Sequence, residues 1–306
     1  MPQVPEPDRR PMQLNHLRDL TVESPLASGQ AFVSAASGIV VRGNRLYVVA
    51  DDAHCMAVFA LDGDRPGELI TLIEGDLPSD KADRKRAKPD FETLVEVPGA
   101  SGGRLLALGS GSTAQRMRGA VIGLGDAGEQ SRARPIDLRP LFAALERLVP
   151  EINVEGAVLA GDGLLLFNRG NMRSPASHVL EVPLGAVLAG APVSASVRAE
   201  LALPMVSGVP LNVTDACRLH DGRILLSTVA EETEDNYADG DLMGAAIVEL
   251  DPEFAVAAIH PLDPPLKVEG IAIRETASGP ELLCVNDADE PSEPSALYSG
   301  AYPPRG

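Results

Sequence analysis

The sequence contains no tryptophan, and only six Phe and four Tyr stand among its 306 residues. A core with so few large rings must be built mainly from Leu, Val, Ile and Ala. Basic residues are also in the minority: 26 Lys and Arg stand against 44 Asp and Glu, which gives a net charge of −18. This charge would repel a nucleic-acid backbone or an anionic membrane surface, so we expect neither as a partner.

Long hydrophobic runs and a matched set of cysteines are missing as well. Residues 1–15 carry four prolines and no apolar run, so we expect neither a secretory signal nor a membrane span. Cys55, Cys217 and Cys284 are an odd set, each in an apolar or strand-like stretch. This favours small buried thiols over a disulfide or a nucleophile. We therefore expect a cytoplasmic protein in a reducing compartment.

Five segments repeat one plan along the chain. In each, a polar or acidic residue opens an apolar strand, and a tight turn leads into a second apolar strand. The first copy continues with two further strands at 57–61 and 68–73. Four antiparallel strands per period form one propeller blade, so the sequence predicts an all-β, five-bladed β-propeller. The opening residues, 54 to 63 positions apart, are Ser37, Glu92, Glu155, Asp215 and Glu269.

The two ends of the chain are expected to meet in one blade. The fifth copy ends near Tyr298 with three strands, and the apolar stretch 12–22 can supply the fourth, so an N-terminal strand closes the last blade. We expect a single propeller domain over 1–306, with residues 1–10 as an extended tail. One helix is predicted over 137–148, between the second and third blades, with Asp137 as its cap.

The five opening residues should converge, because the first strand of each propeller blade lines the central axis. Four carboxylates so close together cannot all stay ionised without compensation: either some take up protons or a cation lies among them. A ring of oxygen ligands without His or Cys favours a hard ion, calcium rather than zinc. Alternatively, these residues hydrogen-bond the backbone of the next blade. The predicted metal ligands are Ser37, Glu92, Glu155, Asp215 and Glu269.

The short sequence motifs of the five copies, and their order, resemble those of the soluble calcium-activated nucleotidases, which are five-bladed apyrases. The matching segments lie at 36–39 and 46–52, 91–94, 154–157, 214–217 and 267–271. The resemblance implies calcium held by Ser37, Glu92, Glu155 and Glu269, whereas Asp215 stands where the family's pattern has serine. That family is usually secretory or membrane-anchored, and no targeting segment is expected here. The Glu-Gly-Ile and Glu-Gly-Ala motifs also resemble, more loosely, those of bacterial phytase-like and lactonase-like propellers.

Charged residues divide between two sides of one face of the predicted ring. The basic side, in blades one to three, contains Lys81, Arg84, Lys85, Arg86, Lys88, Arg116, Arg118, Arg169 and Arg173. The acidic side, in blades four and five, contains Glu231, Glu232, Glu234, Asp235, Asp239, Asp241, Asp287, Asp289, Glu290 and Glu293. Two opposed arcs over an axial metal suit a small anionic molecule that bears phosphate. Solvated loop charge is the other interpretation, and both stay open.

Single residues beside the predicted strands add to this site. Arg169 follows an apolar strand and suits an anion, and the Gly-Ser-Gly-Ser-Thr stretch at 109–113 could offer backbone N–H groups. That stretch is not a P-loop, because no Lys-Ser or Lys-Thr follows it. The five histidines are scattered, so neither a zinc site nor a Ser-His-Asp arrangement is visible. The predicted substrate-binding residues are Arg116, Arg169, Asn168 and Ser110, and the predicted catalytic residues are Asp51 and Asp52.

Three functions remain open at this point. The first is a calcium-dependent hydrolase of phosphate esters or anhydrides, in which arginines hold phosphate and an aspartate positions water. The second is a non-catalytic propeller that binds a ligand or a protein around a structural metal. The third is a lactonase-like hydrolase. Because a fold does not fix its chemistry, the sequence leaves open whether the protein is an enzyme, and it does not indicate the oligomeric state.

Overall fold

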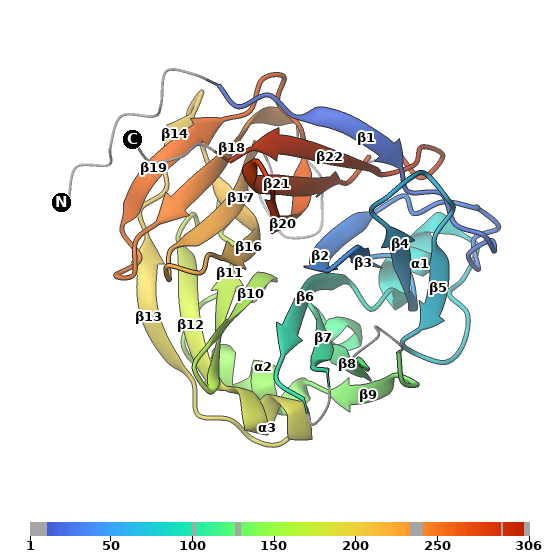
Figure 1. Ribbon diagram of the computed structural model, residues 1–306. Helices are drawn as coiled ribbons and strands as arrows, with labels where there is room; N and C mark the ends of the chain where they lie inside the picture. The colour runs from blue at the N-terminus through green and yellow to red at the C-terminus, as the bar shows by residue number, and fades with distance from the viewer. Residues whose placement is uncertain (1–10, 100–101, 126–129, 233–240, 289, 303–306) are drawn as a thin grey trace.

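The computed structural model describes residues 11–99, 102–125, 130–232, 241–288 and 290–302. Five antiparallel sheets of four strands stand around a common axis in Figure 1, which confirms the predicted five-bladed β-propeller. Blade one consists of β2 (Ala36–Arg42), β3 (Arg45–Ala50), β4 (Cys55–Ala60) and β5 (Glu68–Thr71), and blade two of β6 (Phe91–Val97), β7 (Arg104–Gly109), β8 (Arg118–Gly123) and β9 (Arg134–Asp137). Blade three consists of β10 (Val154–Ala160), β11 (Gly163–Asn168), β12 (Ser177–Pro183) and β13 (Ser196–Leu201), and blade four of β16 (Asn212–Arg218), β17 (Ile224–Glu231), β18 (Leu242–Leu250) and β19 (Val256–Pro261). Blade five consists of β20 (Val268–Thr276), β21 (Gly279–Asn286), β22 (Ala296–Ala301) and β1 (Asn15–Asp19).

The innermost strands, β2, β6, β10, β16 and β20, surround the axis. Each of them packs against the inner strands of both neighbouring blades, so the ring is complete. We call the end of the axial channel at which these strands begin the upper end, and the end at which they turn into their hairpins the lower end. Alternate residues of an inner strand point to its two faces and so pack toward the blade on either side: Leu94 of β6 lies in the layer shared with blade one, and Val95 in the layer shared with blade three.

Blade five is closed by the N-terminal part of the chain, as predicted. Strand β1 pairs antiparallel with β22, with His16 opposite Tyr298 and Asp19 opposite Ala296. The strand is shorter than the predicted apolar stretch 12–22, but Met12 and Val22 also form isolated bridges, with Leu262 and Gly67. Figure 1 shows β1 lying along the outer edge of the last blade.

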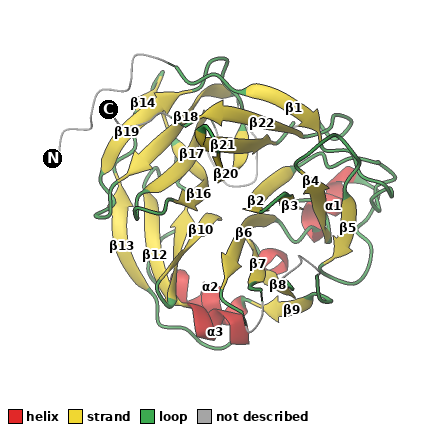
Figure 2. Ribbon diagram, in the orientation of Figure 1, coloured by secondary structure: helices red, strands yellow, loops and turns green. Residues whose placement is uncertain are grey.

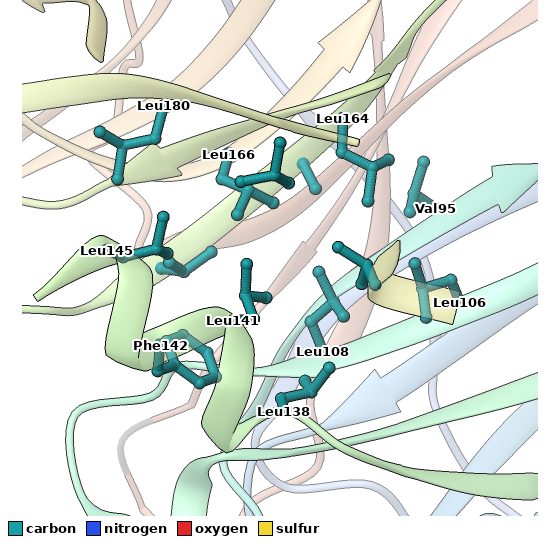
Figure 3. Close-up of a cluster of buried hydrophobic side chains, with 14 of the residues drawn as sticks. Val95, Leu106, Leu108, Leu138, Leu141, Phe142, Leu145, Leu164, Leu166 and Leu180 are labelled. Carbon is teal, nitrogen blue, oxygen red and sulfur yellow. The ribbon is translucent and has the colours of Figure 1, made fainter. Parts of the chain in front are cut away.

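The hydrophobic core consists of separate layers between adjacent blades. The layer between blades two and three joins Leu106 and Leu108 of β7 to Leu164 and Leu166 of β11, and Phe142 is wholly buried in it (Figure 3). Aliphatic side chains fill most of this layer, as the scarcity of aromatic residues requires. Each layer is shared by two blades, so a blade buries its apolar faces only within the ring.

Short helices cover the connections between strands (Figure 2). Helix α2 (Arg139–Leu145) confirms the predicted helix, although Leu138 occupies its N-cap position and Asp137 instead accepts a hydrogen bond from the backbone N–H of Arg139. Helices α1 (Lys81–Ala87) and α3 (Leu184–Ala189) were not anticipated, because seven and six residues are too few to give a clear helical period. A 3-10 turn lies at Ala114–Arg116.

Three smaller features complete the description. A two-stranded sheet of β14 (Met205–Val206) and β15 (Val209–Pro210) precedes blade four. The three thiols are unpaired; Cys284 is buried as expected, whereas Cys55 and Cys217 are only half-buried. Within the described ranges, every helix is too short or too polar to cross a bilayer.

Candidate functional site

A β-bulge marks the same place near the start of each inner strand. The pairing register shifts there, and in blades two, three and five the residue left out of the pairing is Glu92, Glu155 and Glu269, respectively. In blade one the shift spans Ser37. In blade four the residue left out is Thr214, one position before the predicted Asp215. Bulges often re-aim a side chain at a functional centre, and here they recur around the axis.

Glycine follows the bulged residue in three blades, which brings adjacent inner strands close together. A Cβ on Gly156 would lie 2.7 Å from the backbone nitrogen of Ala216, and one on Gly38 or Gly270 would also overlap backbone of the next blade. Asp215 occupies the corresponding place in blade four. Its Oδ2 accepts a hydrogen bond of 2.8 Å from the backbone N–H of Ile271 in blade five. Asp215 therefore follows the alternative interpretation, a side chain bonded to the neighbouring backbone, and its predicted role as a metal ligand stays untested.

The axial glutamates lie near enough to repel one another. Burial raises the pKa of Glu92 and of Glu269 well above the ordinary value, and the nearby charge of Glu155 raises both further. Burial also raises the pKa of Glu155, to about 7, although the Arg169 guanidinium opposes that shift. The sequence predicted that crowding at the axis would force such carboxyls to keep protons or to share a cation.

A second layer of polar residues lies two positions before the bulges. Asp90, Asn153, Asn212 and Lys267 are all buried there. The Asn153 amide donates to Glu155 Oε1 at 2.5 Å, and Lys267 Nζ lies 3.7 Å from Glu269 Oε1. The sequence reasoning missed these four residues. The period of two along a strand could have found them, because residues i and i+2 share a face.

Three carboxylates meet between blades one and two. One oxygen each of Asp51, Asp90 and Glu92 lies within 4.8 Å of the others. The Lys88 ammonium contacts Asp51 Oδ2 and lies 2.8 Å from Asp90 Oδ1. Burial alone would lower the pKa of Lys88, but Asp51, Asp90 and Glu92 together raise it. For Lys88 the sequence left two interpretations open, a solvated loop charge and a residue of the site.

The predicted residues of blade two support this group. Arg116 Nη1 lies 2.9 Å from Asp90 Oδ2 and donates to Ser112 Oγ at the same distance. The Ser110 hydroxyl donates to the same Asp90 oxygen and is completely buried. Arg116 and Ser110 thus reach the charged centre, where they hold Asp90.

Blades three to five contribute a second charged group. Arg169 contacts Glu231 Oε2 and lies 3.5 Å from Glu155 Oε1. Lys267 Nζ lies 3.2 Å from Glu231 Oε1 and 3.8 Å from Asp287 Oδ2. Although burial would raise it, the pKa of Glu231 is lowered because Arg169 and Lys267 flank it. Two buried cations, one from each neighbouring blade, therefore share one carboxylate of blade four.

The remaining predicted residues lie outside these two groups or beyond the described residues. Asn168 Oδ1 accepts from the backbone N–H of Asn153, which holds the entry to β10 in place. Asp52 pairs with Arg84 of helix α1 at 3.5 Å. Of the acidic side, Glu234, Asp235, Asp239 and Asp289 fall outside the residues that the structure describes.

The residues at the upper end provide a direct test of whether calcium would fit. Asp90 Oδ1 is buried and accepts no hydrogen bond; its contact with Lys88 is ionic, outside hydrogen-bond geometry. With Asp51 and Glu92 it forms an all-oxygen group of the kind that hard divalent cations prefer. Burial raises the pKa of Asp51 to about 6, and the Lys88 ammonium opposes this shift. The group fits calcium provided that the lysine yields its place to the ion.

Comparison with solved structures finds similarity to proteins of very different sequence, and for the first of them it shows the fold. A glycosyl hydrolase from Bacteroides ovatus is similar with a TM-score of 0.50 and 10% identity, covering 97% of this chain and 95% of that one. An endo-arabinase from Bacteroides thetaiotaomicron has a TM-score of 0.49 and 11% identity over 94% and 99% of the two chains. A luciferin-regenerating enzyme has a TM-score of 0.47 and 10% identity over 89% and 92%.

At 10% identity the likeness to the glycosyl hydrolase concerns the fold alone, and it does not single out the calcium-activated nucleotidases. No curated protein matches the sequence. The model of a family of unknown function, DUF6929, matches residues 32–301, and the chain therefore belongs to that family.

Proposed function

We propose that the upper end of the axial channel binds a divalent cation, calcium by preference, at Asp51, Asp90 and Glu92. We further propose that this centre hydrolyses small phosphate esters or anhydrides. The observation that carries the proposal is the meeting of three carboxylate oxygens within 4.8 Å of one another. Such a set matches the ligand preference of calcium, and it does not favour zinc, because neither His nor Cys belongs to it.

The surrounding residues would divide the remaining work. A bound cation would polarise the bond to be broken. Arg116, Arg169 and Lys267 are fixed beside the channel by ion pairs with Asp90 and Glu231, and an anionic substrate would compete with these carboxylates for them. Glu155, with its pKa raised by burial to about 7, can both take up and release a proton near neutral pH, as a general acid or base must.

A second candidate is favoured by the cations themselves. Arg169 and Lys267 each contact Glu231, and Lys88 contacts Asp51, so the ion pairs cross from one blade to the next. In this candidate the charged network holds the blades together around a ligand, without turnover. Removing one partner of a buried ion pair of this kind lowers the stability of a protein by about 3–5 kcal/mol.

Metal binding is tested by calorimetric titration of chelator-treated protein with calcium, magnesium and manganese. We expect Glu92→Gln to weaken calcium binding at least about tenfold, because it removes one charged ligand. Glu96→Gln is the matched control: it lies on the same strand β6, but its side chain is exposed near the lower end. Equal calcium binding by both variants, or no calcium heat from the unchanged protein, would contradict the site.

The two candidates respond oppositely to Lys88→Met. The metal proposal expects tighter calcium binding, because the competing ammonium is gone, whereas the network candidate expects lower thermal stability and no metal effect. Turnover is assayed on nucleoside triphosphates, nucleoside diphosphates and p-nitrophenyl phosphate, with calcium and with chelator. Absence of calcium-dependent turnover of all of them, together with a melting temperature lowered by chelator, would favour the non-catalytic candidate.

A further inference from the structure

The lower half of the axial channel differs in chemistry from its charged upper end. Along each inner strand the positions that follow the bulge are mostly apolar, among them Val41, Leu94, Leu159, Cys217 and Ile273. They line a cavity of about 550 Å³ that all five inner strands share. This volume is typical of a site for a small organic molecule.

The shape of the cavity limits what can enter it. Five inner strands, each packed on both neighbours, wall it laterally, so an occupant has to enter end-on from the lower face. At the other end, the axial glutamates and their cations would exclude an apolar group, since burying a charge against hydrocarbon is costly.

Apolar side chains from four blades are left partly exposed to this cavity. Val41, Leu159, Cys217 and Ile273 are only half-buried although they lie on the innermost strands. Apolar walls hold water poorly, because a water molecule needs two or more polar partners. Covering these side chains with an apolar molecule would therefore be favourable.

The charges at the lower rim argue against an anionic ligand. Arg218 donates to the backbone carbonyl of Leu159, and Arg223 is bonded to both Asp221 and Glu249. These guanidinium groups are already engaged within the protein. The acidic groups at the rim are mostly paired as well: Glu96 Oε1 lies 3.7 Å from Arg42 Nη1, and Asp221 Oδ2 lies 2.7 Å from Arg223 Nη2. With these charges of both signs compensated inside the protein, an uncharged molecule suits the rim best.

We propose that the lower half of the channel is a binding site for a small, uncharged and mainly apolar molecule. Its apolar body would lie against Leu94, Cys217 and Ile273, and any polar end would lie near His220 at the rim. The site is separate from the proposed cation centre, so either proposal can fail alone.

The probe for the test is N-phenyl-1-naphthylamine, whose emission rises in apolar surroundings, titrated against the full chain in the presence of chelator. We expect saturable binding of one probe per chain. Cys217→Phe should fill the cavity and weaken binding at least about tenfold. Val197→Phe is the control: Val197 is 43% exposed on the outer strand β13 and lies far from the channel lining. Unaltered probe binding by Cys217→Phe would overturn the proposal.

A second measurement covers the case in which Cys217→Phe does not fold. The chain contains no tryptophan, so Leu219→Trp places a single reporter at the lower rim and Val197→Trp places one on the outside. We expect strong energy transfer to bound probe from position 219 and weak transfer from position 197. Equal transfer from both positions, or no rise in probe emission with the unchanged protein, would overturn the proposal.

Discussion

At the scale of single residues, the axis shows how burial and charge together set protonation. Glu155 accepts a hydrogen bond from Asn153 and lies beside Arg169, yet burial still raises its pKa to about 7. The cations Arg169 and Lys267 and the Asn153 amide are therefore not enough to keep Glu155 fully ionised at neutral pH. This residue gives the most direct test of the axial electrostatics.

We expect Glu155→Gln to alter the pH dependence of stability. A carboxyl whose pKa rises on folding contributes fully below its unfolded value of 4.5, and that contribution is lost as the pH rises through 7. Glutamine cannot ionise, and its amide oxygen can still accept from Asn153. In chelator, the free energy of unfolding of the variant, relative to that of the unchanged protein, should rise by on the order of 3 kcal/mol between pH 4.5 and 7.5. Melting temperatures of both proteins, measured across this pH range, follow the change. A constant difference across this range would contradict the burial argument.

The sequence could place the acids at the axis but not their counter-ions. Glu92, Glu155 and Glu269 were found because each opens a repeated apolar strand. Lys88 is the C-cap residue of helix α1, in a stretch where no periodic pattern tells a buried ammonium from a solvated one. In blade four the register shift falls at Thr214, one position before Asp215, because the sequence pattern does not show which of two adjacent polar residues a bulge will leave out of the pairing.

At the scale of elements, the inner strands approach so closely that glycine is required at their contacts. We expect Gly270→Ala to destabilise the protein by about 3 kcal/mol or more, because its Cβ would overlap the carbonyl oxygen of Ser37 in blade one. Gly185→Ala in helix α3 is the control: a Cβ there meets nothing within 4 Å, and alanine favours the helix by up to about 1 kcal/mol. Urea unfolding of both variants measures the difference, and equal stabilities would contradict the close packing.

A second element-scale prediction concerns the sheet of blade four. Glu249 of β18 accepts from Arg223 at 2.6 Å and lies 3.2 Å from His260 of β19. Burial opposes the shift, but His260 and Arg223 lower the pKa of Glu249 to about 2. Its contribution to stability is therefore present above the unfolded pKa of 4.5 and is lost as the pH falls toward 2.

We expect Glu249→Gln to cost about 1–2 kcal/mol at pH 7, because one charge-assisted acceptor is lost in a partly screened setting. The cost should shrink steadily as the pH is lowered from 4.5 to 3. Chemical unfolding at pH 7, 4.5 and 3 measures it. A cost that is as large at pH 3 as at pH 7 would show that the carboxylate charge is not responsible.

At the scale of the whole molecule, ring closure depends on one short strand. Removal of residues 1–19 would leave the edge of β22 unpaired. We expect a loss of cooperative unfolding and a tendency to associate, since an exposed strand edge pairs with other chains. Leu17→Ala is the control: Leu17 lies on the same strand but is 46% exposed, so the change should stay within about 0.5 kcal/mol. Calorimetry and light scattering measure both outcomes.

The sequence predicted the architecture far better than the site. The repeat of strand, tight turn and strand indicated the number of blades, and the five four-stranded sheets confirm it. The closing strand followed from counting, since the fifth copy lacked its fourth member. The lower cavity had no signal at all, because its lining residues look like ordinary core positions until five strands from distant parts of the chain are brought together.

The position of β1 also has a topological consequence. Residues 12–19 and 296–302 belong to the same blade, so the polypeptide runs once around the ring and returns to its starting place. A circularly permuted chain that joins these two segments by a linker and opens between β5 and α1 would make all four strands of blade five consecutive. The two chain ends would then meet at the boundary between two complete blades. No hydrogen-bonded pair of strands would have to be assembled from opposite ends of the polypeptide.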